Sequence, residues 1–305
     1  MTAVQPAERA ATLRGISLVL LAMLMFACMD GVNKHLTSTY SVIQILWVRY
    51  LILLVFALLL ARPRGVRQAL KTRQPGMQLG RSFVLIVEKG AFIVAFSYLP
   101  VADTHAIGAI APVMVTILAV CFLREQVGLH KALAVAVGFG GVLVIIRPGQ
   151  GVFSATALIP LFAAALFAVY QVMTRAVSHD DRPDTSLLYT ALVGAVVLTA
   201  VGPFNWHSPA GLDWGLLLLV GLLGTSAHFS LIKALKLAPA STLQPFNYSL
   251  FLWAIVVGFV GFDHFPDLWT LTGGVIIVGS GLYALLRERV PTEPECSPML
   301  ETEPT

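Results

Sequence analysis

Ten apolar segments of about 20 residues, joined by short polar connections, occupy most of this chain. A helix needs about 20 apolar residues to cross a bilayer, and helices satisfy their own backbone hydrogen bonds where water is absent. The sequence therefore predicts an all-α integral membrane protein with ten transmembrane helices. These helices are expected at 15–36, 41–61, 79–99, 101–123, 131–147, 154–176, 185–203, 212–236, 238–260 and 268–287.

The low charge content agrees with a location in the lipid bilayer. Only 12% of the residues are charged and the mean hydropathy is +0.82, whereas soluble domains carry about 25% charged residues. No basic patch is interleaved with exposed aromatic residues, so nucleic-acid binding is not expected. The three cysteines have neither a paired framework nor a Cys/His spacing that suits a metal. We therefore expect no metal and no cofactor.

Three motifs recur in the second half of the chain, which indicates an internal duplication. "FACMDGVNK" returns as "FAVYQVMTR", "LPVADT" as "LAPAST" and "GGVLVIIR" as "GSGLYALLR", at offsets of 141, 138 and 140 residues. The nearly constant offset predicts two five-helix repeats, at 15–147 and 154–287. Because five is odd, the second repeat must enter the membrane upside down. Inverted repeats are typical of secondary transporters, which bind substrate near the midplane between the repeats.

Basic residues are distributed unequally between the two predicted sides of the membrane. Sixteen of the 20 Lys and Arg residues fall on the side of the N-terminus, and only Lys34 and Arg147 fall on the opposite side. The remaining two, Arg49 and Lys89, lie within predicted spans. By the positive-inside rule, both termini face the cytoplasm of a bacterial-type inner (plasma) membrane.

The two ends of the chain lie outside the predicted spans. Residues 1–14 are polar and are expected to be a cytoplasmic N-terminus. No small-residue cleavage site follows the first apolar segment, so we expect a signal-anchor helix instead of a removed signal peptide. Residues 288–305 are rich in Pro and Glu and are expected to form a disordered cytoplasmic tail.

Four charged residues lie within the spans, away from the helix ends: Asp30, Arg49, Glu88 and Lys89. A charge at the bilayer centre costs roughly 2.5–3.5 kcal/mol on insertion scales, so such residues are candidates for function. Asp30 and Arg49 have similar predicted depths, which favours a direct ion pair between them. Glu88 and Lys89 are adjacent and point about 100° apart, so each is expected to need its own partner. We predict that both line a central cavity; the alternative is a structural ion pair with another helix.

Further polar residues are candidates for the same cavity. Asn247 and Tyr248 lie near the predicted midplane, beside a helix break expected at Pro245. A proline within a helix frees a backbone carbonyl that can face a substrate, although a plain packing kink is the alternative. Tyr170 and Gln171 are second candidates, because Gln171 aligns with the acidic residue of the first span.

Two histidines and two clusters of small residues are assigned to packing. His105 and His228 could titrate near neutrality, but a hydrogen-bonded packing role is favoured for each. The clusters at 138–141 and 273–281 let helices approach closely. They are expected to serve packing, or a homodimer through the fifth and tenth helices.

The motifs of both halves together resemble a known family. "LPVADTHAIGAIAPVMVTILAVCFLREQVG", "GFGGVLVIIRPG" and "KALKLAPASTLQPFNY" are similar to the EamA-type domain of the drug/metabolite transporter superfamily. The resemblance covers about residues 15–287. It implies ten helices in inverted halves, a cavity lined mainly by helices 1, 3, 4, 6, 8 and 9, and secondary transport of a small-molecule substrate across the lipid bilayer.

Within that family, "MDGVNKHLTSTYSVIQILWVRY" is most similar to members that take up riboflavin or S-adenosylmethionine. The adjacent Glu88 and Lys89 are not a feature of the family pattern. An exporter of amino acids or drug-like metabolites is the alternative function. An intramembrane enzyme is a remote alternative, because Ser226 and His228 point about 200° apart on one helix and cannot act as nucleophile and base together.

Overall fold

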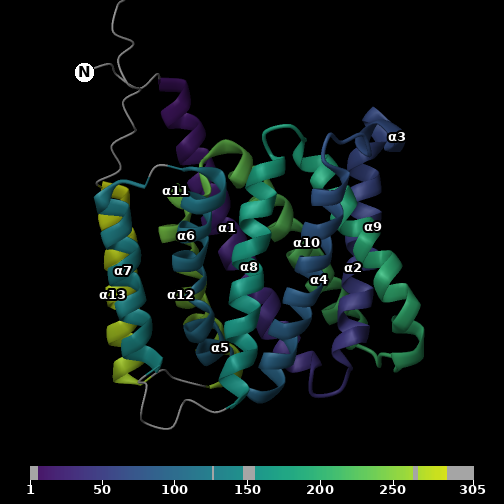
Figure 1. The fold of residues 1–305 in the computed structure, drawn as a ribbon. Coiled ribbons are helices and arrows are strands. Elements are labelled where there is room, and N and C mark those ends of the chain that lie inside the picture. The colour runs from purple at the N-terminus through teal and green to yellow at the C-terminus, as the bar shows by residue number, and fades with distance from the viewer. Residues whose placement is uncertain (1–5, 126, 147–154, 264–266, 287–305) are drawn as a thin grey trace, which may run out of the picture.

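Thirteen α-helices form the part of the chain that the computed structural model describes, residues 6–125, 127–146, 155–263 and 267–286. Figure 1 shows them as one bundle of roughly parallel helices. The first half contains α1 (Pro6–Leu36), α2 (Val42–Ala61), α3 (Val66–Ala69), α4 (Pro75–Tyr98), α5 (Val101–Gly108), α6 (Ala111–Leu123) and α7 (Leu129–Ile146). The second half contains α8 (Leu158–Val177), α9 (Pro183–Val201), α10 (Asp213–Leu237), α11 (Ala240–Asn247), α12 (Ser249–Phe262) and α13 (Leu268–Leu286).

Seven helical segments in the described part of the chain have the length and hydropathy of a membrane span. Each is long and apolar enough to cross a bilayer, and α4 has a similar length but carries Arg81, Glu88 and Lys89. The number of ten spans stays a prediction. The seven segments are Ala10–Leu36, Val42–Arg64, Thr104–Leu123, Leu158–Val177, Pro183–Asn205, Asp213–Leu237 and Ala240–Phe262.

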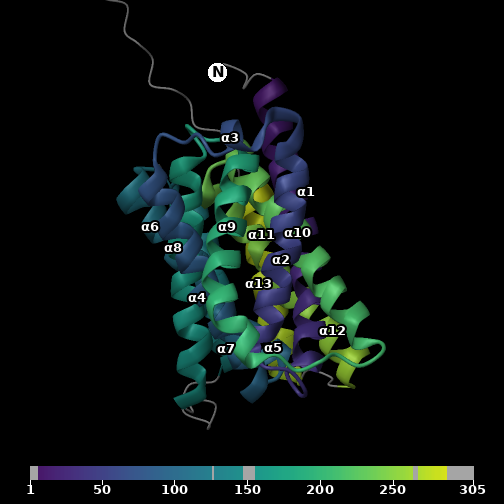
Figure 2. The same ribbon diagram turned by 90° about the vertical axis from the view of Figure 1, so that its right-hand side faces the viewer.

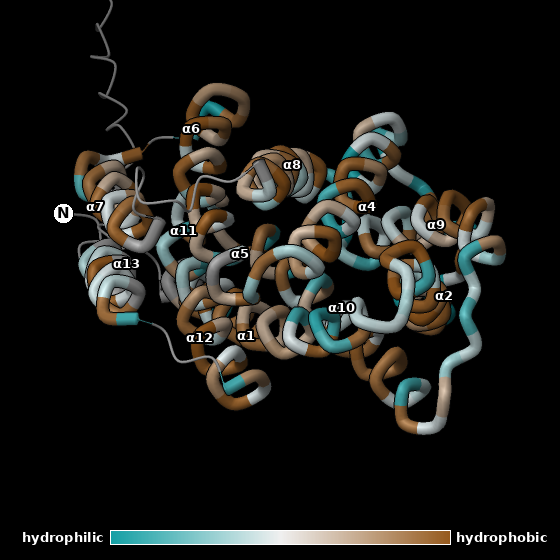
Figure 3. The backbone as a smooth tube through the Cα atoms, turned by 90° about the horizontal axis from the view of Figure 1, so that it is seen from below, coloured by the Kyte–Doolittle hydropathy of each residue, from teal (hydrophilic) through white to brown (hydrophobic). Residues whose placement is uncertain are grey.

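The outer surface is apolar and much of the polar content is internal, as expected of a protein that faces lipid. Large apolar side chains such as Phe122 and Val260 are more than 70% exposed, and hydrophobic residues run along the helices in the view down the bundle (Figure 3). Arg81, by contrast, is completely buried. Its guanidinium donates hydrogen bonds to Gln78, Thr174 and Thr190, which satisfy its polar atoms between α4, α8 and α9.

Proline explains several helix boundaries that hydropathy alone places differently. α4 begins at Pro75, four residues before the predicted span, and α9 begins at Pro183. A proline fits the first turn of a helix because its missing N–H needs no partner there. Pro112 separates α5 from α6, since its ring clashes with the carbonyl of the residue four positions earlier, Gly108, where α5 ends. The predicted span 101–123 is therefore interrupted.

A second break divides the equivalent segment of the second half. α11 ends at Asn247 and α12 begins at Ser249. The sequence placed this break at Pro245, and that position is wrong by three residues, because Pro245 lies inside α11. Both interrupted segments begin directly after a proline, Pro100 or Pro239, so the two halves share this irregularity.

Helix packing follows the duplication. α1 packs along α10, and the equivalent pair, α4 along α8, packs in the same way. α2 contacts its counterpart α9, which lies between α4 and α2 in Figure 2. α7 contacts its counterpart α13 at the edge of the bundle (Figure 1). The main helix contacts between the halves thus have a counterpart or connect equivalent helices.

α1 and its counterpart α8 run in opposite directions. Gly15, early in α1, lies against Ala234 and Ala238 at the C-terminal end of α10. Arg175, at the end of α8, donates a hydrogen bond to the Leu235 carbonyl at the same end of α10. α1 therefore begins at the end of the bundle where α8 finishes.

Gly138, in the first of the two small-residue clusters, serves packing inside the molecule. A Cβ atom added at Gly138 of α7 would lie 2.8 Å from the ring of Tyr248 and 2.9 Å from Ser280 Oγ of α13. His130 of α7 lies 2.8 Å from the hydroxyl of Tyr283 of α13. This close approach confirms the packing role of Gly138, while the homodimer stays a prediction.

Candidate functional site

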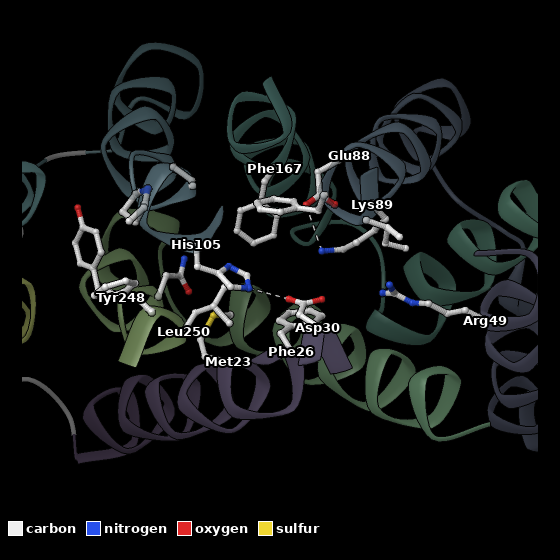
Figure 4. A pocket seen from close by; sticks show the side chains of 18 residues that line it. Met23, Phe26, Asp30, Arg49, Glu88, Lys89, His105, Phe167, Tyr248 and Leu250 are labelled. Atoms are coloured by element: carbon white, nitrogen blue, oxygen red, sulfur yellow. Dashed lines mark hydrogen bonds and ion pairs between the residues drawn. The ribbon is translucent and has the colours of Figure 1, made fainter. Parts of the chain in front are cut away.

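A cavity lies inside the bundle and is lined by both halves of the chain (Figure 4). Its side chains come from α1, α2, α4, α5, α6, α8, α11 and α12. The volume is about 60 Å³, room for about four water molecules. Six of the eight residues proposed from the sequence line it: Asp30, Arg49, Glu88, Lys89, Asn247 and Tyr248.

Glu88 and Lys89 form an ion pair with each other. Lys89 Nζ lies 3.2 Å from Glu88 Oε1, and both side chains are buried. The expectation that each would need a separate partner is wrong, because the long lysine side chain bends back over the 100° between the two positions. Attraction between opposite charges is strong where water is excluded, and this favours the bent geometry.

Aromatic rings surround the ammonium group of this pair. Lys89 Nζ lies 4.8 Å from the ring centre of Phe26, 5.5 Å from that of Phe167 and 5.8 Å from that of Phe92. The negative faces of such rings attract a cation. The three rings come from α1, α8 and α4, so one ammonium group joins both halves of the chain.

Asp30 pairs with His105 and not with Arg49. His105 Nε2 lies 3.1 Å from Asp30 Oδ2 (dashed in Figure 4), and Asn33 donates a hydrogen bond to the other carboxylate oxygen. The direct Asp30–Arg49 contact expected from depth is not formed among the described residues. His105 also stacks on Phe92, with ring centres 5.8 Å apart, so α5 closes this part of the cavity.

The position of His105 within its helix indicates a depth similar to that of Asp30. The assignment of His105 to packing did not use this depth. α1 ends at Leu36 and α5 begins at Val101, next to the Lys34 contact with the end of α4. Asp30 is six residues before the end of α1, about 9 Å, and His105 is four residues after the start of α5, about 6 Å. The two side chains are therefore at similar depth, and His105 belongs to the cavity.

Arg49 reaches into the cavity from α2 without a hydrogen-bond partner for one of its terminal nitrogens. The residue is 3% exposed and its Nη1 atom is unpartnered among the described residues. Asp30 and Glu88 lie within electrostatic reach of its guanidinium. Gly224 of α10 leaves room for the side chain, since a Cβ atom there would lie 2.7 Å from Arg49 Nε.

The opposite part of the cavity is formed at the break between α11 and α12. Asn247 donates a hydrogen bond to Gln244, which in turn donates one to Gln171 of α8. The Tyr248 hydroxyl is buried and unpartnered among the described residues. Gln171 and Tyr170 are buried but do not line the cavity, so their role in the site stays a prediction.

The cavity brings charged, polar and aromatic side chains together. It combines the Glu88–Lys89 ion pair and the Asp30–His105 contact with several aromatic rings. One guanidinium nitrogen of Arg49 and one Glu88 oxygen have no hydrogen-bond partner among the described residues. The described residues include no group of three or more His, Cys, Asp or Glu that could hold a metal ion. Ligand sites usually enclose about 300–1,000 Å³, so the lining must move apart to admit a metabolite.

One end of the bundle is closed by a contact between the two halves. The Glu125 carboxylate, after α6, accepts hydrogen bonds from the backbone N–H groups of Ala240 and Ser241 at the start of α11. Arg175 of α8 lies 3.6 Å from the same carboxylate. A negative charge at a helix N-terminus is stabilised by the helix dipole, so Glu125 fastens α6 to α11.

The other end of the bundle is hollowed at the equivalent place. Lys34 of α1, the counterpart of Arg175, donates hydrogen bonds to the carbonyls of Phe96 and Leu99. A hollow of about 230 Å³ opens beside it, lined by Pro100 at the start of α5 and by Phe262 at the end of α12. The start of α5 lines this hollow, whereas the start of α11 is capped.

Comparison with known proteins extends over nearly all of the chain. The EamA-like transporter family matches twice, at residues 13–147 and 154–286. The riboflavin transporter of Vibrio cholerae serotype O1 is 29% identical over 277 residues, which are 87% of this chain and 91% of that protein. The S-adenosylmethionine uptake transporter of Rickettsia felis is 26% identical, covering 91% of this chain and 94% of that protein.

Two further matches widen the comparison. The pseudopaline exporter of Pseudomonas aeruginosa is 26% identical, covering 87% of this chain and 93% of that protein. A solved crystal structure shares the fold with a TM-score of 0.68 at 18% identity, covering 91% of this chain and 97% of that chain.

Proposed function

The chain belongs to the EamA-like transporter family, and from this premise we propose that it takes up a small heteroaromatic metabolite of the riboflavin or S-adenosylmethionine kind. The protein is a transporter, and the substrate is the proposal. The observation that carries it is the cavity inside a lipid-facing bundle, in which ion pairs lie among aromatic rings. Relatives named for these two substrates align over about nine-tenths of the chain.

We propose ten spans in two inverted halves, with α4, α7 and α13 supplying the three spans beyond the seven apolar segments. The opposite directions of α1 and α8 support inversion. The cytoplasmic location of both termini is supported by ion pairs that gather basic residues at one end of the bundle. Arg64 pairs with Asp184 and Arg73 with Asp180 at the end where α8 finishes.

Transport is proposed to proceed by alternating access. The Glu125 carboxylate closes the end that carries the basic residues, while the start of α5 lines a hollow at the other end. Because the two ends are built from equivalent segments, an exchange of these two arrangements would open the cavity to the other side. The cavity of about 60 Å³ then represents a state in which the lining side chains lie closer together than in the substrate-bound state.

Export is the second candidate direction, since a relative of similar coverage is named as an exporter. The direction is read from metabolite pools in cells that carry the protein and in cells with an empty vector, both supplied with riboflavin and S-adenosylmethionine. Accumulation of one compound inside the cells supports uptake, and loss to the medium supports export. Unchanged pools, with the protein present in the membrane, contradict the proposal.

A matched pair of variants connects transport to the cavity. Asp30→Asn removes the charge that holds His105 and should lower the initial rate about tenfold or more. Asp180→Asn, at the more exposed pair with Arg73, makes the same chemical change outside the cavity and should leave the rate near that of the unaltered protein. Equal rates in the two variants would place the binding site elsewhere.

A further inference from the structure

Several buried polar atoms of the cavity have no hydrogen-bond partner among the described residues. Asn247 Oδ1 and the Tyr248 hydroxyl lie at the break between α11 and α12, and two charged groups with such atoms lie around the Glu88–Lys89 pair. Lys89 occupies one oxygen of Glu88, and His105 occupies Asp30. The second oxygen of Glu88 and Nη1 of Arg49 have no hydrogen-bond partner among the described residues. Glu88 is completely buried and Arg49 is 3% exposed. A buried donor or acceptor without a partner is costly, so these two atoms identify where a ligand, or the water it displaces, is bound.

The chemistry of the two atoms specifies the complementary group. A guanidinium N–H requires an oxygen acceptor, and its planar fork suits a carbonyl or carboxylate. A carboxylate oxygen requires an N–H or O–H donor. Glu88 and Arg49 line the same cavity and lie within electrostatic reach of each other, so a ligand group that lies between them can satisfy both.

We infer, on the basis of the proposed function, that the cavity recognises a head group in which an oxygen acceptor stands beside an N–H donor. Arg49 donates a hydrogen bond to the oxygen of this head group, and Glu88 accepts a hydrogen bond from its N–H. Two kinds of metabolite offer this chemistry. One is the carbonyl–N–H–carbonyl edge of a flat heteroaromatic ring, and the other is an α-amino acid group with its carboxylate and ammonium.

The rest of the ligand lies toward the aromatic rings. Phe26, Phe92 and Phe167 surround the Lys89 ammonium next to Glu88. A flat ring system bound at Glu88 would therefore meet aromatic faces, which favour stacking. Either source of the head group is compatible with a heteroaromatic body.

Gly224 offers a way to move Arg49 while its charge is kept. A Cβ atom at this position would lie 2.7 Å from Arg49 Nε and 3.0 Å from Arg49 Cζ, so Gly224→Ala displaces the guanidinium. Gly215 lies on the same helix, α10, and a Cβ atom there would meet nothing within 4 Å. Gly215→Ala is therefore the matched control.

The test is equilibrium binding to the full-length protein in lipid nanodiscs, measured by calorimetry with two pairs of probes. Riboflavin is compared with N3-methylriboflavin, which lacks the N–H donor, and S-adenosylmethionine with its decarboxylated form, which lacks the carboxylate. We expect one unmodified probe to bind about tenfold more tightly than its modified partner. The pair that shows this difference identifies the head group as the ring edge or as the amino acid.

Gly224→Ala and Arg49→Lys should each weaken binding of that unmodified probe about tenfold, while Gly215→Ala leaves it unchanged. The inference is overturned if every unmodified probe that binds is matched in affinity by its modified partner, and also if affinity is unchanged in both Gly224→Ala and Arg49→Lys. In either case the proposed function stands. If folded wild-type protein binds none of the four probes, the proposed function itself fails and the inference with it.

Discussion

At the scale of single residues, one ion pair of the cavity joins two neighbours in the sequence. Glu88 is fully buried, and its one ion-pair partner among the described residues is Lys89, at 3.2 Å. Removing one member of a buried pair leaves an uncompensated charge, which costs more than removing both. The stability of the protein therefore depends more on the balance between the two residues than on either alone.

Lys89→Met should lower the free energy of unfolding by about 3 kcal/mol or more. The double variant Glu88→Gln, Lys89→Met should lose clearly less, because no charge is left without a partner. Unfolding in mixed micelles, with increasing amounts of a denaturing detergent, measures both values. Equal losses in the single and double variants would contradict a direct pair.

The identity of the cavity residues was more predictable than their partners. A charge within an apolar segment is visible in the sequence, and Asp30, Arg49, Glu88 and Lys89 all line the cavity. Partners depend on side-chain conformation and on which helices meet, and the hydropathy pattern contains neither. For this reason Asp30 was paired with Arg49 on depth alone, whereas the structure places His105 there.

At the scale of helices, α11 depends on a residue from the other half of the chain for its N-terminal cap. Glu125 accepts hydrogen bonds from the N–H groups of Ala240 and Ser241 at 3.1 and 3.0 Å. A cap supplied by its own helix would be kept when the helix moves, but this one is lost if α11 separates from α6. The cap thus ties the stability of one helix to the closed state of that end.

Glu125→Ala should loosen the closed end by removing both hydrogen bonds, with a loss of about 1–2 kcal/mol of stabilisation. Ser241 is 2% exposed, so a cysteine placed there in a background without the native cysteines should react slowly with a water-soluble thiol reagent. The Glu125→Ala change should raise the labelling rate about tenfold. A rate that does not change would show that Glu125 does not hold this end closed.

Helix positions were predicted well from apolar length, and helix interruptions less well. Residues of each predicted span within the described ranges fall mostly in helices. The extension of α4 back to Pro75 and the break before Pro112 follow from proline geometry, which a hydropathy window does not contain. The break at Tyr248 has no such local cause in the sequence.

At the scale of the whole molecule, the proposed topology divides the connections into two sets. The connection between α2 and α4 and that between α8 and α9 lie at one end, joined by the Arg64–Asp184 contact. The connection between α1 and α2 lies at the other end, where Tyr40 donates a hydrogen bond to Asp213 at the start of α10. From the unequal distribution of basic residues we propose that the first end faces the cytoplasm.

Cysteines at single positions test this assignment. In a background without native cysteines, a cysteine at Ser38 should react with a membrane-impermeant thiol reagent in intact cells. A cysteine at Lys71 or His179 should react only after the cells are opened. The reverse pattern would invert the protein in the membrane, and a mixed pattern would contradict the ten-span arrangement.

The ion pair within α4 also bears on how the protein is made. Helices enter the bilayer in order during synthesis. As one of the proposed spans, α4 enters before α8 and α10 exist. A lysine or glutamate whose only partner was on one of those later helices would be exposed to lipid as an unpaired charge. Because Glu88 and Lys89 neutralise each other within α4, the nascent helix carries its own counter-charge, and the pair can enter the membrane in advance of the cavity that it later lines.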